Sequence, residues 1–125
     1  MDIVITEWAL NSYLELRAQQ AFTDQDYWRT IRPDVLLLTS YPVHPRFLQS
    51  NFWSQEIPHG YKMKWHHMGN GKVQIRLPVG ILDFAYLCEA YVKESPKQEA
   101  RKLARFKTHL QLVRLGRFTE RGRLS

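Results

Sequence analysis

The sequence predicts an α+β fold in which an antiparallel sheet of about four strands carries helices on one face (β-α-α-β-β-β-α). Two periodicities predict it. Apolar and polar residues alternate over residues 61–66 and 73–77, as in half-buried strands. Apolar residues recur every three or four positions over residues 8–20 and 96–116, as in amphipathic helices. The chain has 125 residues, enough for one core and too few for two ordinary domains.

The N-terminal part is predicted to hold one strand and two helices. Residues 3–6 form a short β-branched run, which we expect to be an interior strand. Thr6 is placed to cap a helix that ends near Gln20. Thr23, followed three residues later by Asp26, predicts a capping box and a second, short helix.

The next segment changes character after Pro33. This proline is tolerated at a helix start, so residues 35–38 are predicted to be helical rather than extended. Residues 41–59 contain three prolines among several aromatic residues. We expect an ordered, packed excursion without regular structure there.

The chain from residue 61 to residue 93 is predicted to form an antiparallel meander. The two alternating segments flank Gly69-Asn70-Gly71, whose residues tolerate positive φ, and this combination predicts a β-hairpin. Residues 84–93 are expected to supply a third long strand.

The C-terminal part is predicted to be a basic helix followed by a tail. Ser95-Pro96 marks the helix start, and Gly116 its end. We expect the domain to comprise residues 1–116, and residues 117–125 to be a loose basic tail that can be removed without loss of the fold.

The charge is divided unevenly along the chain. Residues 1–60 carry four Lys or Arg against seven acids, a net of −3, whereas residues 61–125 carry fourteen against five, a net of +9. Such an excess favours a polyanionic partner, either nucleic acid or an acidic protein. A soluble protein that is merely basic is the alternative.

The sequence favours a cytoplasmic protein without a membrane segment. No uninterrupted apolar run approaches the roughly 20 residues that a membrane helix needs. Asp2 stands where a secretory signal would carry basic residues. The single cysteine, Cys88, excludes an intramolecular disulfide, and its position on the apolar side of its strand predicts a small buried hydrophobe.

Strand alternation predicts one polar face on the meander. If the apolar sets stay together, this face gathers Lys62, Lys64, His66, Arg76, Glu89, Tyr91 and Lys93. Cations can hold a phosphate and stabilise its developing charge, while His, Glu or Tyr can transfer protons. The alternative is an ordinary solvent-facing surface with a cross-strand ion pair between Arg76 and Glu89.

The sequence contains no motif for a metal site, a phosphate-binding loop or a serine nucleophile. His66 and His67 are adjacent and would point to opposite faces of a strand, so no metal site is expected. There is no glycine-rich phosphate loop and no G-x-S-x-G motif, and we expect no cofactor.

Residues 60–107 resemble the RelE/ParE toxin superfamily of type II toxin–antitoxin systems, and most closely its HigB-type branch. The resemblance rests on Gly60-Tyr61-Lys62-Met63-Lys64-Trp65, Val73-Gln74-Ile75-Arg76-Leu77, Leu87-Cys88-Glu89-Ala90-Tyr91-Val92-Lys93, and Pro96 with Glu99-Ala100-Arg101. Residues 1–20 match only in the order of elements. The sequence departs from the family in its longer segment 39–59, in Glu94 where a basic residue is usual, and in lacking His or Tyr just after the last strand.

The resemblance implies a small bacterial toxin that is neutralised by a cognate antitoxin protein. Many such toxins cleave mRNA on the ribosome, and others poison gyrase. By resemblance, Lys62, Lys64 and Lys93 match basic positions that would bind RNA, and Arg76 matches the arginine of the central strand. Together with the face argument, this predicts a metal-independent mRNA endoribonuclease that uses the 2′-hydroxyl as nucleophile, with Arg76, Glu89, Tyr91 and His66 as catalytic residues. A gyrase-targeting toxin and a non-catalytic nucleic-acid-binding module are the alternatives.

Overall fold

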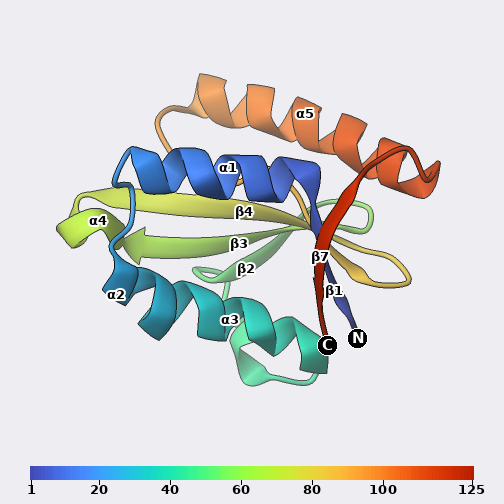
Figure 1. Cartoon of the computed structure of the whole chain (residues 1–125), viewed down its shortest axis with the longest axis horizontal. Coiled ribbons are helices and arrows are strands. Elements are labelled where there is room, and N and C mark those ends of the chain that lie inside the picture. Colours follow the sequence, from blue (N-terminus) through green and yellow to red (C-terminus); the bar gives the residue numbers. More distant parts are fainter.

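The computed structural model describes residues 1–125 as one mixed sheet with helices on both faces (Figure 1). The strand order is β2-β3-β4-β5-β1-β7, and β6 pairs with β4 next to β5. The strands are β1 (Ile3–Thr6), β2 (Trp53–Ile57), β3 (Gly60–His67), β4 (Val73–Ile81), β5 (Ala85–Leu87), β6 (Tyr91–Val92) and β7 (Glu120–Leu124). The α+β class is confirmed, but the sheet has seven strands rather than about four.

The first strand is interior, as predicted, and it makes the sheet mixed rather than antiparallel. β1 pairs parallel with β5 on one edge and antiparallel with β7 on the other. Thr6 closes the strand and caps α1 (Glu7–Ala18), since its hydroxyl oxygen accepts from the Ala9 N–H at 3.3 Å. The same hydroxyl donates to the Leu87 carbonyl at 2.6 Å, which holds the start of α1 to β5.

The predicted capping box is confirmed at Thr23. Its side chain accepts from the Asp26 N–H, and Asp26 accepts in return from the Thr23 N–H, both at 3.0 Å. The helix then runs through α2 (Asp24–Asp26), η1 (Tyr27–Ile31), α3 (Arg32–Leu36) and η2 (Leu37–Ser40), so the helical prediction for residues 35–38 also holds. Asp26 additionally accepts from the Gly69 N–H at 2.8 Å, which fixes this helical segment to the hairpin turn.

The segment 41–59 is packed as expected, but it is not free of regular structure. It contains η3 (Pro45–Leu48) and strand β2, which pairs antiparallel with β3. Phe47, Phe52 and Trp53 are buried in the main core. Trp53 stacks on Tyr61 of the adjacent strand with ring centroids 4.9 Å apart. This aromatic contact stabilises the pairing of β2 with β3, although residues 53–57 show no alternation of apolar and polar residues that would predict a strand.

The hairpin of β3 and β4 is confirmed, and its short connection α4 (Met68–Gly71) places Gly69 and Asn70 at positive φ. The prediction of a third long strand over residues 84–93 is wrong in one respect. It is interrupted by residues 88–90, which divide it into β5 and β6. At the interruption the Ala90 N–H donates to the Ser12 hydroxyl at 2.9 Å, so α1 takes a bond that a continuous strand would have used within the sheet.

Helices lie on both faces of the sheet, which corrects the prediction of a single helical face. Residues of α1, η1 and α3 share one core with Met63, Trp65 and Leu77. α5 (Pro96–Arg114) packs on the opposite face, where glycines make room for it. A Cβ on Gly80 would lie only 2.5 Å from Leu110 Cδ1. Figure 1 shows α5 above the strands and α2–α3 below them.

The C-terminal residues are a strand rather than a loose tail. In β7, Leu124 pairs with Ile3 and Arg123 pairs with Val4. The Thr119 N–H donates to Glu7 at 2.9 Å, which ties the approach to β7 to α1. The sequence Glu-Arg-Gly-Arg-Leu has little to bury, so it forms a strand because β1 offers a free edge. The predicted boundary at residue 116 therefore does not separate a domain from a tail.

No helix has the combination of length and apolar character needed to cross a bilayer.

Candidate functional site

Three of the predicted site residues form a row across neighbouring strands. Lys64 of β3 pairs with Arg76 of β4, which pairs in turn with Tyr91 of β6. Lys62 lies two residues before Lys64 and therefore projects from the same face. The predicted common face thus exists for these four side chains, although it is not open to solvent along its length.

Helix α5 lies against Tyr91 and Lys62 and adds a carboxylate to them. Glu99, in the first turn of α5, accepts from the Tyr91 hydroxyl at 2.7 Å and from Lys62 Nζ at 3.0 Å, both through Oε2. We refer to Lys62, Tyr91 and Glu99 as the Glu99 cluster. Lys62 Nζ also lies 3.3 Å from Glu56 Oε1 on β2. The second carboxylate oxygen of Glu99, Oε1, is buried and makes no hydrogen bond.

Arg76 lies behind the Glu99 cluster and is almost wholly buried. Only 4% of the residue is exposed, and Tyr91 is 5% exposed. The Arg76 guanidinium donates to Gln74 Oε1 at 2.8 Å and makes a longer contact of 3.4 Å with the Ile75 carbonyl. Burial lowers the pKa of Arg76, while the charge of Glu99 opposes that shift. Arg76 therefore acts on the cluster as a nearby buried cation.

The electrostatics of the cluster leave a charged acceptor beside a protonated donor. Burial alone would raise the pKa of Glu99, but the hydrogen bonds from Tyr91 and Lys62 and the positive charges outweigh it, so this pKa is lowered. Burial, followed by the hydrogen bond to Glu99, raises the pKa of Tyr91. At neutral pH the carboxylate is ionised and the phenol keeps its proton.

The cluster lines a hollow of about 340 Å³ between the sheet and α5, which we call the Glu99 hollow. Its remaining walls come from β2, β4 and α5, including Glu56, Pro78 and Phe106. A cation, a phenol and a carboxylate around one hollow can hold an anion and transfer protons to and from it.

Lys64, at one end of the row, lies with the predicted residue His66 in a different depression. Lys64 Nζ donates to the Ser50 carbonyl at 2.9 Å, and His66 Nε2 lies 3.0 Å from the Asn51 carbonyl. They line a notch of about 200 Å³ that has no lining residue in common with the Glu99 hollow. Burial, with the charge of Lys62, lowers the pKa of Lys64. The structure therefore does not bring His66 to Tyr91.

Glu89 and Lys93 are likewise separate from the cluster. Glu89 pairs with α5, lying 2.8 Å from Arg105 and 3.5 Å from Lys102. The cross-strand pair with Arg76, which belonged to the alternative of an ordinary solvent-facing surface, is absent because residues 88–90 leave the strand. Lys93 is exposed, and its backbone N–H donates to the Gln74 carbonyl at 2.9 Å.

Glu99 was not among the predicted site residues, although a signal for it existed. It follows Ser95-Pro96, which predicts the start of a helix, so a place in the first turn could be inferred. What the periodicity could not give was the face of the sheet on which that turn lies.

Cys88 is buried and makes only a long contact of 3.7 Å with the Tyr86 carbonyl. Burial raises the pKa of this thiol to about 12. It is therefore a neutral thiol at physiological pH. No group of three or more His, Cys, Asp or Glu side chains is arranged to hold a metal ion.

The lowered pKa of Glu99 predicts a specific pH dependence of stability. A carboxyl group whose folded pKa lies below its unfolded value, about 4.3, contributes stability that is present above that value and lost as pH falls through the folded pKa. Glu99→Gln should therefore reduce the decline in unfolding free energy on acidification below about pH 5. Urea denaturation at several pH values measures this, and the exposed Glu94→Gln serves as control. An unchanged acid dependence in Glu99→Gln would contradict it.

No family model, curated protein or solved structure matches this chain. The function must therefore be inferred from the chemistry of its side chains.

Proposed function

We propose that this protein is a metal-independent endoribonuclease that cleaves mRNA, acting as the toxin of a toxin–antitoxin pair in the bacterial cytoplasm. The observation that carries the proposal is the Glu99 cluster. It places an ionised carboxylate, a protonated phenol and an ammonium group around one hollow, with the buried Arg76 behind them. Together these groups can supply the base, the acid and the positive charge that accelerate cleavage of a phosphodiester by the adjacent 2′-hydroxyl.

The roles follow from the charge of each group. Glu99 accepts the proton of the 2′-hydroxyl, whose oxygen forms a bond to phosphorus. Tyr91 gives its proton to the 5′ oxygen as the bond between that oxygen and phosphorus breaks. Lys62 holds a non-bridging phosphate oxygen, and the charge of Arg76 stabilises the negative charge that develops. The products are a 2′,3′-cyclic phosphate and a free 5′-hydroxyl.

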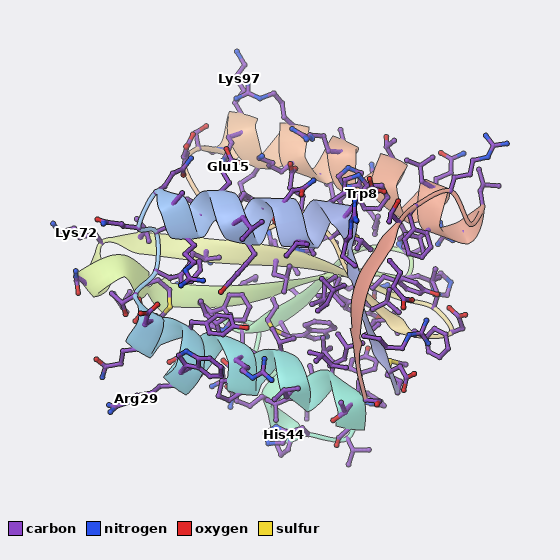
Figure 2. The ribbon with its side chains drawn as sticks, viewed as in Figure 1. Trp8, Glu15, Arg29, His44, Lys72 and Lys97 are labelled. Atoms are coloured by element: carbon purple, nitrogen blue, oxygen red, sulfur yellow. The ribbon has the colours of Figure 1, made fainter.

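The exposed surface of α5 supports an RNA substrate. Lys97, Arg101, Lys107 and Arg114 are all exposed on this helix. Figure 2 shows Lys97 projecting from the start of α5 into solvent. Cations of this kind attract phosphates without reading sequence, so they would draw RNA or the ribosome towards the Glu99 hollow. An acidic antitoxin would recognise the same charges.

The proposal is tested with purified protein and two matched oligonucleotides. Wild-type protein, in chelator and with or without ribosomes, should cleave RNA and leave a cyclic phosphate. It should not cleave the same strand when the nucleotide before the cut carries 2′-deoxyribose. Induction in a bacterial host should arrest growth and fragment mRNA. Harmless induction with no cleavage, or equal cleavage of the deoxy-substituted strand, would overturn the proposal.

A non-catalytic nucleic-acid-binding module is the second candidate, and a specific observation favours it. Lys62, Tyr91 and Arg76 are all engaged by groups within the chain, so the basic outer face of α5 is the more accessible polyanion-binding feature. This candidate predicts affinity that falls steeply with salt and no turnover. A gyrase-targeting toxin would instead leave mRNA intact and trap cleaved DNA.

A further inference from the structure

An apolar cavity lies on the face of the sheet opposite the Glu99 hollow. It is bounded by α1, the helical segment from η1 to α3, and the sheet, and its volume is about 230 Å³. Fifteen of its sixteen lining residues are hydrophobic, among them Ala9, Tyr13, Trp65, Leu77 and Ala90. The single exception is Arg32. We call this space the Arg32 cavity.

The size and lining of the Arg32 cavity set what can occupy it. Protein interiors are close-packed, and voids larger than a water molecule are few. An apolar cavity of about 150 Å³ in another protein stays dry and binds benzene. The Arg32 cavity is larger than that, and its polar side-chain groups belong only to Arg32, Tyr13, Tyr27 and Trp65, whose indole already donates to Asp34. An apolar molecule therefore fits this space better than ordered water does.

Arg32 adds a charge requirement to the apolar lining. The residue is partly exposed and makes no side-chain hydrogen bond or ion pair within the chain. Its guanidinium carbon lies 5.3 Å from the ring centroid of Trp28, which is itself 63% exposed. The carboxylate of Asp34, two residues along the chain, forms no ion pair with Arg32. Its Oδ2 accepts instead from Arg46 and from the Trp65 indole, both at 2.9 Å. Arg32 is thus a cation at the cavity with no anion of its own.

We propose that the Arg32 cavity binds a small amphipathic carboxylic acid, such as a medium-chain fatty acid. The apolar chain occupies the space between α1, α3 and the sheet, and the carboxylate pairs with Arg32, for which a guanidinium has the matching planar geometry. This site is independent of the proposed RNA cleavage, because the two spaces lie on opposite faces of the sheet.

Calorimetry on the full chain with octanoate and octanol tests the proposal. Octanoate should bind saturably with one molecule per chain and raise Tm. Arg32→Gln should weaken octanoate binding by about tenfold or more while changing octanol binding by less than about twofold. Arg29→Gln is the matched control, because Arg29 is exposed, lies outside the lining and points away from the molecule in Figure 2. It should leave octanoate binding unchanged.

Two cavity-filling variants keep the test independent of any one mutant's folding. Ala9→Leu fills the space from α1, and Ala90→Leu fills it from the sheet side. Either variant that retains a cooperative thermal transition should lose both ligands. The proposal is overturned if wild-type protein binds neither ligand below micellar concentrations. It is also overturned if Arg32→Gln leaves octanoate affinity intact, or if a folded, filled variant still binds.

Discussion

Glu99→Gln should lower the rate of RNA cleavage by about 10²- to 10⁴-fold, the usual contribution of a positioned general acid or base. Glutamine has nearly the same shape and can still accept from Tyr91 and Lys62, whose bonds to Glu99 measure 2.7 and 3.0 Å. It carries no charge and cannot take the proton of the 2′-hydroxyl. The measurement is single-turnover cleavage of one RNA, with circular dichroism showing that the fold is kept.

The control for this variant is Glu94→Gln, since Glu94 is exposed and forms no ion pair. It removes the same charge from the same region without touching the cluster, so it should cleave at the wild-type rate. Tyr91→Phe should also be slow, because it lacks the phenolic proton. Near-normal cleavage by a folded Glu99→Gln variant would remove Glu99 from the mechanism.

Removal of residues 117–125 should lower the unfolding free energy by roughly 3 kcal/mol or more, because it removes backbone bonds and apolar burial together. β7 pairs with β1, and its last residue, Leu124, packs against the core. Phe118 packs edge-on against Tyr86 with ring centroids 5.7 Å apart. A loss of this size corresponds to a fall in Tm of roughly 10 °C for a domain of this length.

A control variant removes two positive charges from the same segment but keeps strand β7. Arg117 and Arg121 are exposed and form no ion pair, so changing both to Gln should leave Tm nearly constant. Differential scanning calorimetry of the two variants separates strand pairing from charge. If the truncated chain melts at the wild-type temperature, then β7 contributes nothing to stability and the sequence-based expectation of a dispensable tail was right.

The elements that could be predicted carry their own local signals. Thr6 and Thr23 cap helices through their own side chains, and Gly69 and Asn70 provide the positive φ of the hairpin turn. β2 and β7 could not be predicted because their conformation depends on edges offered by residues distant in sequence. The interruption at residues 88–90 likewise depends on Ser12, which lies 78 residues from Ala90.

The same difference between local signals and distant contacts explains why the site was predicted only in part. Alternation places Lys62, Arg76 and Tyr91 on one face from local sequence alone. An amphipathic stripe shows that α5 must pack, but it does not say on which face of the sheet. Sequence reasoning therefore missed Glu99. It also placed Arg76 on an accessible face, although only 4% of the residue is exposed. Because Arg76 is buried, Arg76→Ala would disturb packing as well as chemistry, and Glu99→Gln is the cleaner variant.

The interior position of β1 has a consequence for how the nascent chain acquires its shape. β1 is made before the other strands of the sheet, yet Thr6 bonds to Leu87, 81 residues later, and the adjacent Asp2 bonds to Arg123, 121 residues later. Contacts of such long sequence separation form slowly and only after both partners have been made. β1 therefore stays unpaired until β5 has been made, and the sheet closes only after β7 has emerged. The Glu99 hollow needs α5 in place, so it assembles only after residues 96–114 have been made.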